Sequence, residues 1–197
     1  MRSKPFIVAV IVIVLLVMSG CAGCVVRNGL VAAEEEVKSE WANVQSAYQR
    51  RADLVPNLVR TVERAETFDR GLVHSLESVQ TRAGEMRLSP DDATNPALLA
   101  EYDALQTEVR TSLDNLLAVT NTSESLRSIE AFRDLQDQIE GSENRINVAR
   151  RDYNGAVAAY NARIRRFPAN VVASLSGLES RPHFQADDGA ENPPRVD

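Results

Sequence analysis

The stretch FRDLQDQIEGSENRINVARRDYNGAVAAYNARIRRF, from Phe132 to Phe167, decides the fold of this chain. Apolar or small residues recur along it in steps of four and three, at Leu135, Ile139, Ser142, Ile146, Ala149, Tyr153, Ala156 and Tyr160. An average step of about 3.5 residues places these side chains on one seam of a helix that faces a partner helix. The stretch contains no proline, so we expect a single long helix.

Three earlier segments show the same spacing. Their seams are Val37, Trp41, Val44 and Tyr48; then Leu72, Leu76, Val79 and Ala83; then Leu98, Tyr102, Leu105, Val109, Ser112, Leu116 and Val119. Polar connections around residues 88–96 and 120–125 separate the later segments. Four amphipathic segments joined by short loops predict an all-α, up-down-up-down four-helix bundle with long first and fourth helices.

Two prolines bear on where these helices begin and bend. Pro56 lies inside the first pattern, where it costs a hydrogen bond, so we expect either a kink or a restart with Asp53 as N-cap. Asn95 and Pro96 are typical of an N-cap and a first helical position, and they predict the start of the third helix.

The first 27 residues predict an N-terminal membrane anchor. Arg2 and Lys4 precede an uncharged run over residues 5–26, as in a signal peptide or a membrane span. Residues 18–21, Met-Ser-Gly-Cys, resemble a bacterial lipobox, in which Cys21 would carry the lipid anchor. The alternative is an uncleaved transmembrane helix from Phe6 to Val26, which is long enough to cross a bilayer. Both alternatives keep the positive charges in the cytoplasm and export the rest of the chain.

Residues 28–168 form the predicted bundle, and residues 169–197 follow it. In the latter, Val171, Val172, Leu175 and Leu178 form a short amphipathic stripe, which suits either the lipid surface or a cap over the bundle end. From Glu179 onward the chain is acidic and rich in proline, and we expect it to be largely disordered.

Composition excludes several classes of function. Without Arg2 and Lys4 the chain has 20 basic and 28 acidic residues, a net charge of −8 that repels nucleic acid. Its two cysteines lie in the anchor, so no disulfide framework is expected. Neither His74 nor His183 follows a glutamate by three residues, as a di-iron bundle requires. Catalytic and phosphate-loop motifs are also missing from the sequence, so we expect no enzyme activity, no cofactor and no metal.

The fourth helix carries an unusual polar line. Asn147, Asn154 and Asn161 recur every seven residues, beside Gly155. Asparagine is a poor helix former, so a plain solvated surface does not explain the repeat. One interpretation is hydrogen bonding to the second or third helix, and the other is a docking face for another chain.

Several longer motifs resemble the LemA family. They are Trp41, QRRADLVPNLV at residues 49–59, LQDQIEGSENRINVARRDYN at 135–154, YNARIRRFP at 160–168 and RPHF at 181–184. The resemblance implies a helical bundle tethered by its N-terminus to a bacterial envelope membrane. It also implies no established enzymatic activity and association with other membrane proteins.

Two functional hypotheses follow. The favoured one is a membrane-tethered, extracytoplasmic scaffold or sensor of the cell envelope. It would bind envelope proteins, or a second copy of itself, through helix faces. The alternative is a bundle that binds a small apolar ligand in a cavity near Pro56.

Overall fold

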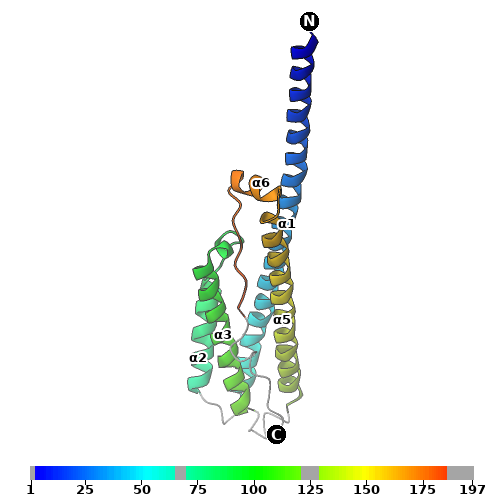
Figure 1. Cartoon of the computed structure of the whole chain (residues 1–197). Coiled ribbons are helices and arrows are strands. Elements are labelled where there is room, and N and C mark those ends of the chain that lie inside the picture. The colour runs from blue at the N-terminus through cyan, green and yellow to red at the C-terminus, as the bar shows by residue number, and fades with distance from the viewer. Residues whose placement is uncertain (1–2, 65–69, 121–128, 186–197) are drawn as a thin grey trace, which may run out of the picture.

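The computed structural model describes residues 3–64, 70–120 and 129–185, and the regular structure among them is helical. The elements in order are α1 (Ser3–Glu63), α2 (Arg70–Glu85), the 3-10 turn η1 (Asp92–Thr94), α3 (Pro96–Thr120), α5 (Glu130–Ile164) and α6 (Ala169–Leu175). The four long helices run alternately up and down (Figure 1). The predicted all-α bundle with long first and fourth helices is confirmed.

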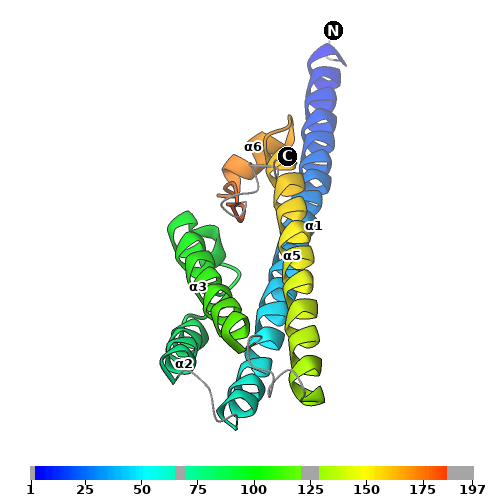
Figure 2. The same ribbon diagram turned by 90° about the horizontal axis from the view of Figure 1, so that it is seen from below.

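The bundle is built from two helix pairs. The longer helices, α1 and α5, lie antiparallel along each other, and α2 packs against α3 beside them (Figures 1 and 2). The seam predicted for α5 is buried at every position except Ala156, which is half-buried. Val157 takes that place in the core with no exposed surface.

Helix α1 is continuous, because the predicted anchor and the first bundle helix are one helix of 61 residues. It also runs through Pro56, so the alternative of a restart at Asp53 is wrong. The bundle core begins at Leu30, which is fully buried, and the helix before it projects beyond the bundle (Figure 1). Among the described residues, no helix combines the length and the apolar character needed to span a bilayer.

All four long helices contribute to the core. At the end distant from the N-terminus, Leu58 of α1, Leu76 of α2, Leu113 of α3 and Phe132 of α5 belong to one buried cluster. A second cluster surrounds Trp41 and includes residues that follow α5. The start of α3 is as predicted, since Asn95 Oδ1 accepts a hydrogen bond of 2.9 Å from the backbone N–H of Ala97.

The segment after α6 corrects a prediction. Residues 178–185 have no helical structure, yet they run back along the bundle between α3 and α5 (Figure 1). Phe184 is only 4% exposed, so the disorder predicted from Glu179 is wrong for residues 179–185. The prediction of disorder rested on the acidic composition of the tail. Composition does not show that one aromatic side chain is buried or that the backbone of this segment is hydrogen-bonded. The remainder of the predicted tail, residues 186–197, lies outside the described residues.

Candidate functional site

The asparagines of α5 bind the chain's own C-terminal strap, as we name residues 181–185. Asn161 Nδ2 donates to the carbonyl of Arg181, and the N–H of Arg181 donates to Asn161 Oδ1, both at 2.8 Å. Asn154 makes the same pair with Phe184, at 3.1 Å and 2.9 Å. Each amide side chain therefore satisfies both backbone groups of one strap residue, as a neighbouring β-strand would.

The spacing of the asparagines matches the spacing of the strap. Seven residues of α-helix rise about 10.5 Å. Three residues of extended chain, the separation of Arg181 and Phe184, span roughly 10 Å. A heptad repeat of asparagine on a helix is thus in register with every third residue of an extended segment. This match accounts for Asn154 and Asn161, the second and third members of the repeat.

Charged side chains tie the strap to α1 and α5 directly, and to α3 through Arg150. Arg181 Nη2 lies 2.6 Å from Glu34 Oε1 of α1. Arg150 of α5 pairs with Asp103 of α3 at 3.0 Å and donates to the carbonyl of Gln185 at 3.1 Å. These ion pairs are largely shielded from solvent, so removing one partner of such a pair costs more stability than breaking an exposed pair does.

The strap also completes an aromatic cluster. The ring of Phe184 stacks on Trp41 at 6.0 Å and meets Tyr153 edge-on at 5.3 Å, while Trp41 contacts Tyr102 at 5.7 Å. The Trp41 Nε1–H donates to the carbonyl of Leu88 at 3.3 Å, which joins the connection before α3 to the cluster. Burial raises the pKa of Tyr102 and of Tyr153 to about 12, because the charged phenolate would lose its hydration in the core.

A buried arginine joins three helices at the centre of the bundle. Arg51 of α1 is 2% exposed, and its Nη1 lies 2.9 Å from Glu143 Oε1 of α5. Its Nη2 donates to both oxygens of Gln106 in α3, at 2.6 Å to the side chain and 3.1 Å to the carbonyl. The guanidinium also lies 5.3 Å from the centre of the Tyr48 ring. Sequence reasoning missed this residue, although it lies in the QRRADLVPNLV motif.

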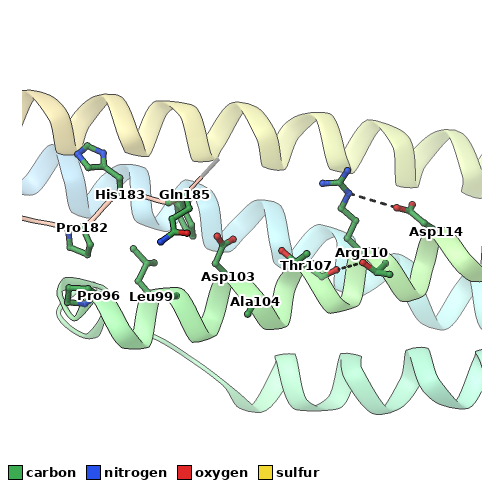
Figure 3. Close-up of a pocket in the computed structure, with 13 residues that line it drawn as sticks. Pro96, Leu99, Asp103, Ala104, Thr107, Arg110, Asp114, Pro182, His183 and Gln185 are labelled. Carbon is green, nitrogen blue, oxygen red and sulfur yellow. Dashed lines mark hydrogen bonds and ion pairs between the residues drawn. The ribbon is translucent and has the colours of Figure 1, made fainter. Parts of the chain in front are cut away.

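A groove of about 680 Å³ lies between α3 and the strap. Leu99 and Asp103 of α3 point toward Pro182 and Gln185 across it, and Arg110 and Asp114 line its far part (Figure 3). The groove is open and mixes apolar with charged side chains. Such a lining fits a polypeptide surface better than a small molecule, which prefers an enclosed, mostly apolar cavity.

The surface on either side of Pro56 bears on the ligand-binding alternative. A groove of about 360 Å³ on one side is lined by Asn57, Arg60 and Thr61 together with residues of α5. A groove of about 880 Å³ on the other side includes Arg51 and Asp53. Both linings are rich in polar and charged groups, so they give no support to a site for a small apolar molecule.

The remaining predicted site residues lie apart from the strap contacts. Asn147 and Gly155 are exposed on α5, and a Cβ added at Gly155 would meet no atom within 4 Å. The hydrogen-bond partner of Asn154 and Asn161 is the strap rather than α2 or α3, whereas docking of another chain at this face stays a prediction. Cys21 is exposed on α1 and forms no disulfide. Within the described ranges, His, Cys, Asp and Glu form no group of three or more arranged for a metal ion.

Comparison with known proteins gives one family and several relatives. The LemA family model matches residues 40–197. Two magnetosome proteins of Paramagnetospirillum magneticum, MamQ 1 and MamQ 2, are each 24% identical over 210 residues, which cover 96% of this chain and 76% of theirs. MamQ of Magnetospirillum gryphiswaldense is 21% identical over 186 residues, or 84% of this chain and 67% of its own. Because the family model spans most of the sequence, including the motifs that hold the strap and the buried arginine, the chain belongs to the LemA family.

Proposed function

We propose that this protein is a membrane-tethered, extracytoplasmic scaffold or sensor that binds other envelope proteins without catalysing a reaction. The observation that carries the proposal is the continuity of α1, whose C-terminal half lies in the bundle core while its N-terminal part projects from it. In that part Phe6 is 70% exposed and Val25 is 73% exposed. A helix with so much apolar surface requires a covering, which a membrane supplies. The similarity to magnetosome proteins supports the membrane association.

The continuous helix gives the tether a mechanical consequence. No flexible linker separates the projecting part from Leu30, where the core begins. If the anchor is the uncleaved helix, the bundle therefore keeps a fixed direction relative to its anchor, and a tilt or rotation imposed on either part reaches the other. This property suits a scaffold that holds partners at a set distance from the membrane, and it suits a sensor that transmits their binding.

The partner-binding part of the proposal rests on the outer face of α5. This face is an exposed stripe of Gly141, Val148, Gly155 and Ala162. A glycine inside a helix costs about 1 kcal/mol relative to alanine. At Gly141 and Gly155 nothing within the described chain lies close enough to require a missing side chain. Close approach of a partner helix over these positions explains the two glycines.

The tether is tested at Cys21. If Cys21 carries the lipid anchor, Cys21→Ser leaves an unprocessed precursor and abolishes incorporation of labelled fatty acid. Normal mobility and membrane recovery of the variant support the uncleaved helix instead. In both cases protease added outside the cytoplasmic membrane digests the bundle, and full protection of the bundle in intact spheroplasts would overturn the proposed side.

The partner face is tested at Gly155. Gly155→Arg places a long charged side chain on the outer face of α5, where the structure leaves room for it. We expect this variant to lose its crosslinks to envelope proteins in intact cells while keeping a stable fold. Gly84→Arg is the matched control, because Gly84 is an equally open glycine on α2. Equal crosslinking patterns for the two variants and the parent would contradict the proposed face.

A further inference from the structure

An exposed apolar stripe runs over α6 and the turn before it. Phe167 lies in the turn before α6, Val171 and Leu175 lie on α6 at steps of four from it, and the three are 84%, 50% and 84% exposed. On the opposite side, Ala169 and Ala173 are buried against the core. The short helix thus packs through its two alanines and Val172, and it exposes Val171 and its largest apolar side chain, Leu175. This is the reverse of what water favours at a protein surface.

The stripe lies at the end of the bundle from which α1 projects (Figure 1). Helix α6 contacts α1. In the last turn of α5, which precedes α6, Arg163 Nη1 donates to the carbonyl of Gly29 in α1 at 2.8 Å. Val172 of α6 and Val26 of α1 pack against the same core cluster. The exposed stripe is therefore level with the point where the apolar part of α1 begins.

Positive charge gathers at the same level. Arg27 of α1 and Arg163, Arg165 and Arg166 at the end of α5 are all exposed. No acidic residue lies between Arg163 and Leu178 in the sequence, although the chain as a whole is acidic. A belt of arginine beside exposed phenylalanine and leucine is complementary to a phospholipid surface, where phosphates lie outside the acyl chains.

We infer that α6 is a second membrane contact. Phe167, Val171 and Leu175 enter the interface of the phospholipid surface that holds α1, and the arginines meet its phosphates. The inference rests on the proposed tether and goes beyond it, because one helix fixes the distance of a bundle whereas two contacts also fix its tilt. The buried side of α6, Ala169 and Ala173, at the same time caps the bundle end.

The contact is tested with tryptophan fluorescence of the full chain in vesicles of phosphatidylglycerol and brominated phosphatidylcholine. Phe167→Trp adds a probe on the stripe, while native Trp41, 1% exposed in the core, supplies a constant background. Val119→Trp is the control, because Val119 is 45% exposed and lies at the other end of the bundle, on the last turn of α3. We expect bromine to quench most of the emission added by Phe167→Trp and little of that added by Val119→Trp. Leu175→Glu in the Phe167→Trp background should restore much of the emission.

Flotation of the same vesicles separates two failures. If the chain floats with the vesicles but Phe167→Trp is quenched no more than Val119→Trp, the tether stands and the contact of α6 is overturned. If the chain does not float, the proposed tether fails and the contact falls with it. Quenching at position 167 that Leu175→Glu relieves supports the contact, because a merely local change at Phe167 would not respond to the other end of the stripe.

Discussion

The side-chain amide of Asn154 makes two hydrogen bonds with the backbone of Phe184, one to its carbonyl and one from its N–H. A neighbouring β-strand would satisfy the same two groups. Asn154→Ala leaves the N–H and the carbonyl of Phe184 without these partners, and each such loss costs roughly 1 kcal/mol. We therefore expect a loss of about 1–3 kcal/mol in the free energy of unfolding, measured by urea denaturation in detergent.

Asn147→Ala is the control for that variant. Asn147 belongs to the same heptad repeat but is exposed, and alanine is the better helix former by several tenths of a kcal/mol. Its stability should stay level or rise slightly. Equal effects of the two substitutions would show that the strap is not held by Asn154.

Phe184 ties the strap to the aromatic cluster. Phe184→Ala removes the ring that stacks on Trp41 and should destabilise the bundle by about 3–4 kcal/mol. Water then reaches Trp41, so its emission should shift to longer wavelength. His183 is the exposed neighbour, so His183→Ala should change neither the stability nor the emission wavelength of Trp41. An unshifted Trp41 spectrum in Phe184→Ala would contradict the packing of Phe184 on Trp41.

Arg51 holds three helices together at the bundle centre. Arg51→Met leaves the Glu143 carboxylate without its ion-pair partner. We expect the free energy of unfolding to fall by about 2–4 kcal/mol, toward the low end because the Glu143 side chain is 22% exposed. Adding Glu143→Leu should recover part of this loss. Arg82→Met breaks a pair whose side chains are 52% and 50% exposed, so it should cost under about 1 kcal/mol. Losses of similar size for Arg51→Met and Arg82→Met would refute the central role of Arg51.

The tyrosines make stability depend on alkaline pH. The unfolded chain releases the Tyr102 proton near the ordinary pKa of 10.0, whereas in the fold the pKa is about 12. The contribution of the neutral ring is therefore complete below pH 10.0 and is lost as pH rises toward about 12. Stability should fall across this window, and Tyr102→Phe should flatten the fall. Denaturation midpoints of the parent and of Tyr102→Phe, measured at several pH values, check both expectations. An unchanged pH dependence in Tyr102→Phe would contradict the burial of the Tyr102 hydroxyl.

Sequence pattern predicts the bundle but not all of its seams. In α3 the prediction included Leu98, Leu105, Ser112 and Val119, none of which is fully buried. The buried residues are instead Leu99, Gln106, Leu113 and Thr120, one position further along. A pattern of hydrophobicity cannot rank Gln106 above Leu105 as a core residue. Gln106 is buried because its side-chain and backbone oxygens both accept hydrogen bonds from the guanidinium of Arg51. That partner lies 55 residues away in the sequence.

The strap shows a similar limit. The heptad repeat of asparagine was visible in the sequence, and it indicated that something docks on α5. Its ligand was not visible, because the strap is recognised mainly through its backbone, which every sequence shares. The side-chain signals were Arg181 and Phe184 of the RPHF motif, which lie in an acidic tail whose composition predicts disorder.

A photoreactive phenylalanine analogue at position 155, compared with the same analogue at position 84, tests the scaffold function most directly. Both positions are open glycines in helices, so incorporation should perturb the fold equally little. On irradiation of intact cells, we expect discrete adducts with one or a few envelope proteins, or with a second copy of the chain, at position 155 and not at position 84. Absence of adducts at position 155, or the same adducts at both positions, would contradict the scaffold function.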